Sequence, residues 1–365
     1  MALIVIDARI INSSTGRYVE RLLHYMQEID AENKYVVLVR KKDETFWTPS
    51  AANFKVKVAE FDNYSFAEQI GFRRFLNKLH PDLVHFCMPQ QPIFYRGTSV
   101  TTIHDLTLLH TYNSDKNWFI FHFKQFVGRF VFYQVARKNT AILSPTEYTK
   151  SRLVDFAHID AAKVHVTPLA AEPVSTTRTV PYELPFSRFI MYVGQYPDYK
   201  NIRRLGDAHQ KLLENHPDLG LVLVGKLGKD TRNTKTYFEA RGYKNIHFTD
   251  FIPDEQRDWL YSNTAAYIFP SLMEGFGLPG LEAMAAGAPA VSSNASCLPE
   301  VYGDAAHYFD PKDTDDMVRA IDEVLKNDKL RATLIQKGYA QVKKYSWRRT
   351  AEQTHAVYLK ALSKD

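Results

Sequence analysis

The residues best suited to chemistry lie in segment 274–286, which reads EGFGLPGLEAMAA. Two glutamates, Glu274 and Glu282, stand eight positions apart with three glycines and a proline between them. An apolar, strand-like run ends just before this segment, so the pattern predicts a strand, a glycine-rich loop and a helix with Pro279 in its first turn. Gly275 and Gly277 would let backbone amides approach a ligand, and the free N–H groups at a helix start favour phosphate. The segment therefore predicts an anion-binding loop.

The two glutamates indicate which other groups the ligand carries besides its phosphate. An ionised carboxylate only accepts hydrogen bonds, so Glu274 and Glu282 suit hydroxyl groups rather than phosphate. Hydroxyls on both sides of a diphosphate are the chemistry of a sugar nucleotide, which has a sugar at one end and a ribose at the other. An alternative stays open, because acidic residues are also favoured near a helix N-terminus by the helix dipole.

These residues and their surroundings resemble the retaining glycosyltransferases of family 4, which have the GT-B architecture and carry two glutamates with seven residues between them. The resemblance extends over residues 269–282 and continues in the short elements 287–289, 293–296, 298–300 and 303–306. Other family-like elements lie in order from residues 6–9 to residues 345–348. It implies an α/β fold of the GT-B type, with two doubly wound Rossmann-like domains facing across a cleft.

The resemblance also implies roles for individual residues. Glu282 would hold the ribose hydroxyls and Glu274 a sugar hydroxyl, while backbone amides of the loop would hold the sugar and the phosphate. The donor-binding residues implied in this segment are Glu274, Gly275, Phe276, Gly277, Leu278 and Glu282.

A diphosphate donor also needs positive charge. Lys200 and Lys226 each follow a strand-like run and a glycine of the second half, and basic residues in these two loops contact the diphosphate in the family. A lysine beside a turn can equally be an ordinary surface residue. Many relatives have arginine where this chain has Gln195. Either the two lysines suffice, or Arg203 or Arg204 compensates.

His104 is the expected site residue of the first half. It ends a strand-like run in the sequence TIHDL, and the family has a matching His-Asp element whose histidine contacts the donor sugar near the reacting carbon. Asp105 could orient the imidazole, and a purely structural histidine is the alternative. Gly16 fits the first glycine-rich loop of the family, which approaches the donor. The expected catalytic residues are His104, Glu274 and Lys200.

Composition sets the broad class. The 365 residues include 45% aliphatic and aromatic residues and 24% charged residues, which is typical of a globular protein with two domains. The net charge of +5 is modest, and we recognise no nucleic-acid-binding module. Cys87 and Cys297 lie in different halves without metal-ligand spacing, so neither a disulfide framework nor a zinc site is expected. The first residues do not resemble a signal peptide, and a cytoplasmic location is expected.

The chain divides by pattern into an N-terminal acceptor domain over 1–170, a linker over 171–187, a donor domain over 188–345 and a C-terminal helix over 346–365. By the resemblance, this helix would return to the first domain. Alternating apolar runs and helical patterns predict a parallel sheet in each domain. The expected strands are 3–6, 35–39, 54–58, 83–86, 99–103, 141–144 and 164–166 in the first, and 189–194, 219–225, 246–248, 266–269 and 290–292 in the second.

Segment 117–138 has two interpretations. It is crowded with aromatic residues and carries Lys124, Arg129, Arg137 and Lys138, as a helix at a membrane surface or lipid-linked acceptor would. A helix buried in its own domain is the alternative, because apolar residues surround the helix instead of forming one stripe. Peripheral contact with the inner face of the cytoplasmic membrane is therefore one expectation.

The sequence leads to a retaining glycosyltransferase that transfers a hexose from a nucleoside diphosphate sugar to a saccharide or lipid-linked acceptor in polysaccharide assembly. Resemblance to bacterial mannosyl- and rhamnosyltransferases makes GDP-mannose the first donor to test. No cofactor is expected beyond the donor itself. No metal is expected either, because lysines and a helix start can neutralise the leaving diphosphate. The alternatives are an epimerase or phosphorylase of the same fold, or a non-catalytic subunit that binds sugar nucleotides.

Overall fold

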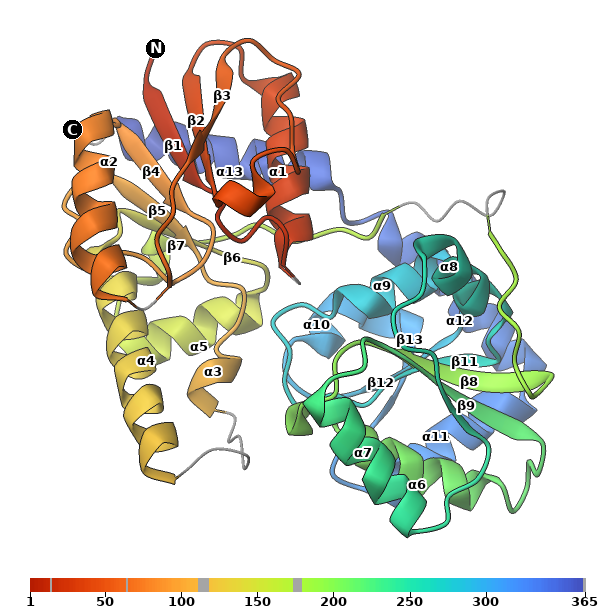
Figure 1. Cartoon of the computed structure of the whole chain (residues 1–365). Coiled ribbons are helices and arrows are strands. Elements are labelled where there is room, and N and C mark those ends of the chain that lie inside the picture. Colours follow the sequence, from red (N-terminus) through yellow and green to blue (C-terminus); the bar gives the residue numbers. More distant parts are fainter. Residues whose placement is uncertain (14, 64, 111–117, 173–178, 364–365) are drawn as a thin grey trace. The chain divides into compact units, whose positions relative to one another are not determined.

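The computed structural model describes residues 1–13, 15–63, 65–110, 118–172 and 179–363 (Figure 1). The chain forms two compact units. The first unit consists of Met1–Leu169 with Ser346–Asp365, and the second of Ala170–Tyr345. The last helix of the chain thus belongs to the first unit. None of the helices, over the residues described, is long and apolar enough to span a membrane.

A seven-stranded parallel sheet forms the centre of the first unit, in the order β3-β2-β1-β4-β5-β6-β7. Its strands are β1 (Leu3–Asp7), β2 (Lys34–Val39), β3 (Phe54–Val58), β4 (Leu83–Phe86), β5 (Ser99–Thr102), β6 (Ala141–Ser144) and β7 (Val164–Val166). The helical elements are α1 (Gly16–Ile29), η1 (Lys41–Asp43), η2 (Ala67–Phe72), α2 (Arg73–Leu79), α3 (Thr107–His110), α4 (Trp118–Lys138), α5 (Glu147–Ala157), η3 (Ala161–Lys163) and α13 (Trp347–Leu362).

Helices cover both faces of this sheet, so its strands read as apolar runs. Val84 and Phe86 of β4 pack with Phe72 and Leu76 beneath η2 and α2. His85 points to the opposite face, because successive side chains of a strand alternate, and its ring bonds to Tyr358 of α13. α1 packs beside α13 on that face.

The second unit has a six-stranded parallel sheet in the order β10-β9-β8-β11-β12-β13. Its strands are β8 (Arg188–Val193), β9 (Leu219–Val224), β10 (Ile246–Phe248), β11 (Ala266–Phe269), β12 (Ala290–Ser293) and β13 (Ala306–Phe309). The helical elements are η4 (Asp198–Lys200), α6 (Ile202–Leu212), α7 (Lys229–Ala240), α8 (Asp254–Asn263), α9 (Leu278–Ala285), α10 (Leu298–Tyr302), η5 (Gly303–Ala305), α11 (Thr314–Lys326) and α12 (Asp328–Val342). Helices α6 and α11 cover one face, and α9 and α12 the other (Figure 1).

The expected α/β fold with two Rossmann-like parallel sheets is confirmed. All twelve predicted strands are present within one or two residues of their predicted bounds. One strand was missed: β13 contains only four residues, Ala306–Phe309, and two of them are partly exposed. It lies at the edge of the sheet, where a short strand has a weaker apolar pattern.

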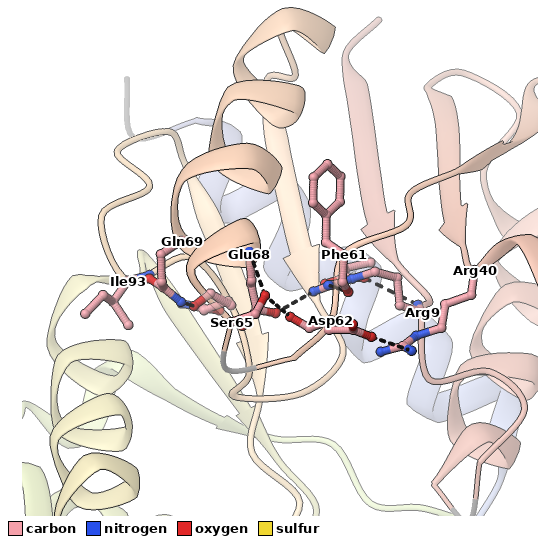
Figure 2. Close-up of polar contacts among 10 residues, drawn as sticks. Arg9, Arg40, Phe61, Asp62, Ser65, Glu68, Gln69 and Ile93 are labelled. Atoms are coloured by element: carbon pink, nitrogen blue, oxygen red, sulfur yellow. Dashed lines mark hydrogen bonds and ion pairs between the residues drawn. The ribbon is translucent and has the colours of Figure 1, made fainter.

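A buried charge cluster closes the carboxyl end of β1 (Figure 2). The guanidinium of Arg9 donates to both carboxylate oxygens of Asp7 at 2.8 Å, to Glu68 at 3.0 Å and to the carbonyl of Phe61 at 2.8 Å. It also lies over the ring of Phe72, 4.0 Å from the centroid. Burial alone would lower the pKa of Arg9, but the two carboxylates raise it above its ordinary value. The arginine thus stays charged and ties the loop before η2 to the end of β1.

Replacing Arg9 should lower the stability of the first unit. Arg9→Met leaves two buried carboxylates without their cation, so the free energy of unfolding should fall by about 3–5 kcal/mol. Arg40→Gln is the matched control, because Arg40 pairs with the exposed Asp62 at 3.2 Å and should change stability by less than about 1 kcal/mol. Urea unfolding of both variants measures the difference. Equal midpoints for the two would contradict the importance of the cluster.

Candidate donor site

The candidate site of the second unit lies where the strand order reverses. β8 pairs with β9 on one side and with β11 on the other, so the chain leaves the centre of the sheet in both directions. Ligands of open α/β sheets bind outside the carboxyl ends of the strands at such a point. The loop after β8 leads to Lys200, and the loop after β11 contains Glu274. The fold therefore brings together two predicted site residues that are far apart in the sequence.

Lys200 and Glu274 form a direct ion pair. Lys200 Nζ lies 2.5 Å from Glu274 Oε1, and the two side chains are only 15% and 12% exposed. The ammonium group also lies 5.3 Å from the ring centroid of Tyr199 and 5.6 Å from that of Phe269. Low exposure strengthens the attraction between the charges. Each residue thus neutralises the charge of the other.

Backbone and side-chain hydrogen bonds hold the two loops in place. Asn201 has a left-handed backbone (φ 61°), and its side-chain amide donates to the backbone carbonyls of Pro270 and Pro311. The Leu272 amide donates to the Tyr199 carbonyl at 2.8 Å. The Glu274 amide donates to the Ser296 hydroxyl at 3.1 Å. The hydrogen bonds thus join the loops after β8, β11, β12 and β13 around the pair, and the sequence did not reveal these supports.

The predicted loop and helix are present, with α9 starting at Leu278 and Pro279 in its first turn. Gly277 precedes the helix with φ 86°, a backbone conformation that residues with a side chain rarely adopt. A Cβ atom added at this position would lie 2.5 Å from the Tyr302 hydroxyl. That hydroxyl donates to the Gly277 carbonyl. Packing against Tyr302 thus requires glycine at this position, independently of any ligand. Gly275 and Phe276, the neighbouring predicted donor-binding residues, are buried.

The other predicted donor residues of this unit lie in different surroundings. Glu282 is only 7% exposed. Burial alone would lower the pKa of Arg257, and the charge of Glu282 is the first of the causes that raise it. Lys226 is exposed just beyond β9. Two backbone hydrogen bonds are the main causes that lower the pKa of Asp250, and the charge of Lys226 makes a smaller contribution in the same direction.

The two arginines proposed to offset Gln195 differ. Arg204 donates to the Pro311 carbonyl at 2.8 Å and to Asn201, so it supports the loop. Arg203 lies over the ring of Tyr237 and lines a cavity of about 260 Å³ beside η4 and α6. Gln195 itself is exposed. Arg204 lines the same cavity, so the two differ in their contacts rather than in their access to it.

In the first unit, His104 follows β5 and its ring has a defined partner. His104 Nε2 lies 3.1 Å from the Cys87 carbonyl, which can only accept, so Nε2 carries the hydrogen. A neutral ring then presents Nδ1 as an acceptor. Burial lowers the pKa of His104, although the Cys87 carbonyl and Asp105 oppose this. The Asp105 carboxylate accepts from the Thr107 amide at 2.8 Å, so the ring's hydrogen-bond partner is the Cys87 carbonyl rather than Asp105.

A buried network lies beside His104. The Tyr18 ring meets the imidazole edge-on with centroids 4.8 Å apart, and its hydroxyl bonds to Thr102 at 2.8 Å. His85 joins Thr102 to Tyr358 of α13 through its two ring nitrogens. Burial lowers the pKa of His85 to about 3, so the network contains a neutral imidazole. These residues were not predicted, because no sequence spacing links them.

Gly16, the remaining predicted donor residue, is the first residue of α1. An added Cβ would lie 1.8 Å from the Ile11 carbonyl oxygen, so the tight turn before α1 requires glycine. Glu147 begins α5, with Thr146 as the helix cap. Among the residues described, no cluster of three or more histidine, cysteine or acidic side chains could hold a metal ion.

Family models match both units. The model described as Glycosyltransferase Family 4 matches residues 15–173, and the model described as Glycosyl transferases group 1 matches residues 184–341. The chain belongs to the family 4 glycosyltransferases.

Individual proteins show the same relationship. The chain is 33% identical to the O-antigen chain mannosyltransferase B of Escherichia coli over 60% of each chain. It is 32% identical to the MMP alpha-(1->4)-mannosyltransferase of Mycolicibacterium hassiacum over 63% of this chain and 56% of that protein. The chain thus spans less than two thirds of the length of either relative. The structure of sucrose-phosphate synthase from Thermosynechococcus elongatus matches all of both chains with a TM-score of 0.80 at 16% identity, a likeness of fold.

Substituting Gly277 should disturb the loop. Gly277→Ala combines a strained backbone with a clash against Tyr302, so stability should fall by roughly 2 kcal/mol or more. Gly228→Ala is the control, because an added Cβ there meets nothing within 4 Å and the backbone is extended. Thermal unfolding compares the two variants. A Gly277→Ala protein as stable as the control would rule out this role of Tyr302.

Proposed function

We propose that this chain is a retaining, metal-independent glycosyltransferase that transfers a hexose from a nucleoside diphosphate sugar to a saccharide or lipid-linked acceptor. The observation that carries the proposal is the Lys200–Glu274 ion pair at the switch point of the second sheet, beside the start of α9. Family membership supports the reaction class, and the two mannosyltransferase relatives make GDP-mannose the first donor to test. A cytoplasmic location with contact at the inner membrane face belongs to the same proposal.

Binding of the donor would give each member of the ion pair a new partner. A diphosphate carries more negative charge than one carboxylate, so it competes for the Lys200 ammonium group. Lys226 and the free amides of Phe276, Gly277 and Leu278 at the start of α9 would add to its stabilisation. Glu274 would then be released to accept a hydrogen bond from a sugar hydroxyl. The chain thus uses one preformed interaction to prepare both halves of the donor site.

The remaining roles follow from the same donor. Glu282 would accept hydrogen bonds from the ribose hydroxyls, at some cost because it is already largely buried near Arg257. His104 would accept a hydrogen bond from the donor sugar through Nδ1. As the leaving diphosphate departs, Lys200 and the helix start meet its growing charge, while Glu274 lies near the positive charge that develops on the sugar. Front-face substitution through an oxocarbenium-like state gives retention without a protein nucleophile.

A donor screen followed by a turnover assay tests the function. GDP-mannose and other nucleoside diphosphate sugars are compared by thermal shift, since a ligand at about 100 times its Kd stabilises by about 2.7 kcal/mol. Lys200→Met should abolish the shift, whereas Lys343→Met, at an exposed position of the same unit, should not. Release of nucleoside diphosphate with acceptor, unchanged by EDTA, completes the test. Binding without turnover would indicate a sensor, and free sugar formed without acceptor would indicate another GT-B enzyme.

The two glutamates should affect different kinetic constants. Glu282→Gln weakens ribose contacts that exist before and during the reaction, so it should chiefly raise the donor KM, by roughly tenfold for about 1.5 kcal/mol. Glu274→Gln should chiefly lower kcat, because its carboxylate acts near the reacting sugar. Steady-state kinetics on both variants decide the assignment. The reverse pattern would exchange the two roles.

Acid should inactivate the enzyme through His104. The neutral imidazole is needed as an acceptor, and burial lowers its pKa, so kcat/KM for the donor should stay constant down to pH 6.5 and fall only below it. His104→Gln should have lower activity without this acid limb. The pH profiles of both proteins provide the measurement. An acid limb above pH 7, or one that persists in the variant, would contradict the assignment.

A further inference from the structure

Helix α4 presents an unusual outer face. Over its described part, Val131, Phe132, Val135 and Ala136 are buried in the core of the first unit. The opposite face would normally be polar. Instead Phe126 is 69% exposed and Phe130 is 46% exposed. Over residues 125–138, one face of the helix therefore satisfies the buried interpretation of this segment, while the other face keeps large aromatic side chains in solvent.

Helical geometry places these aromatic residues together. At 3.6 residues per turn, Phe126, Phe130 and Arg137 point within about 40° of one another, and Arg129 lies about 60° to one side of Phe126. Val135 points about 180° away from Phe126 by the same count. The exposed aromatic and basic residues thus form one stripe along the helix. We call Phe126, Arg129, Phe130 and Arg137 the outer stripe of α4.

A further exposed ring lies beside the C-terminal end of α4, about 100° around the helix from Arg137. Lys138, at the end of α4, donates to the Ile93 carbonyl at 2.9 Å, and its ammonium group lies 4.9 Å from the ring centroid of Phe94. Phe94 is itself 54% exposed. The exposed ring of Phe94 therefore adds to the aromatic surface, again beside a cation.

Within segment 118–146 the charges have one sign, and the exposed Asp155 belongs to the neighbouring α5. From residue 118 to residue 146 the sequence contains no aspartate or glutamate, whereas it contains Lys124, Arg129, Arg137 and Lys138. A solvated helix face usually carries both signs, and single exposed apolar residues are common. Here the apolar residues lie one turn apart and alternate with cations. Aromatic rings suit the interfacial layer of a bilayer, and each cation near it gains from anionic headgroups.

We propose that the outer stripe of α4, with Phe94 and Lys138 beside it, docks on an anionic lipid surface. The phenylalanine rings enter the headgroup layer, and the arginines pair with lipid phosphates. The inference deepens the proposed function and rests on it in one respect: the surface is where a lipid-linked acceptor is met. Val131, Phe132, Val135 and Ala136 stay in the core of the first unit.

Vesicle flotation tests the proposal with the full chain, without donor or acceptor. One set of vesicles is phosphatidylcholine alone, and the other is an equimolar mixture with phosphatidylglycerol. We expect binding to the mixture only, weakened by added salt. Phe126→Ser with Phe130→Ser, and separately Arg129→Gln with Arg137→Gln, should each reduce the partition constant at least tenfold, because each cation near an anionic surface contributes several-fold.

Matched controls change equally exposed residues elsewhere. Phe46→Ser removes a ring that is 47% exposed, and Lys329→Gln with Lys343→Gln removes two exposed charges. Both should bind the mixed vesicles like the unchanged chain. Equal binding to both kinds of vesicle, no binding at all, or equal losses in the controls and the stripe variants would overturn the proposal. Since the assay contains no donor, a failure of docking is distinct from a failure of glycosyl transfer.

Discussion

A parallel sheet brings the carboxyl ends of all its strands to one edge, and the candidate sites of both units depend on this constraint. In the second unit it places the loops after β8 and β11 side by side, so Lys200 and Glu274 meet. In the first unit it places the end of β4 beside the end of β5, so the Cys87 carbonyl orients His104. The order of the strands in the sheet thus makes neighbours of residues that are distant in sequence. No local sequence pattern specifies these contacts.

Polar side chains at these edges need partners, and the two units provide them differently. The first unit encloses Asp7, Arg9 and Glu68 in a permanent cluster, in which the arginine also holds a loop carbonyl. The second unit pairs Lys200 with Glu274 at a place where both keep some exposure. A buried cluster of the first kind is structural, because removing one member leaves charge without compensation. A partly exposed pair of the second kind can be opened by a ligand of greater charge.

Much of the fold could be predicted because buried parallel strands read as short apolar runs, such as residues 189–193 and 219–224. The helix after the glycine-rich loop could be predicted from Pro279 and Gly287, and its bounds are Leu278–Ala285. The strand β13 could not, because an edge strand of four residues has too weak a pattern. Local signals thus suffice where an element is long or fully buried.

The sequence predicted which residues belong to the donor site, but it did not predict their contacts. Lys200 and Glu274 were both expected at the donor, but their pairing depends on the strand order, which no local pattern specifies. The supports of the site are Asn201, which is next to Lys200 and donates to the carbonyls of two other loops, and Ser296 and Tyr302, which lie in other segments and each form one hydrogen bond with the loop. Asp105 precedes a helix and bonds to its backbone, whereas the His104 ring bonds to the Cys87 carbonyl after β4, a contact that no sequence spacing indicates.

The return of α13 to the first unit also bears on synthesis. This helix supplies Tyr358 and His355, which bond to His85 and Asp30 of the first unit. The ribosome makes α13 only after the whole second unit, roughly ten seconds or more after residue 169 at ordinary elongation rates. The second unit is continuous in sequence and can fold during this interval, whereas the first unit must wait with the part of its sheet that α13 covers exposed. A nascent chain is therefore most prone to aggregation through its N-terminal half, the reverse of the usual order in which the N-terminal domain is completed first.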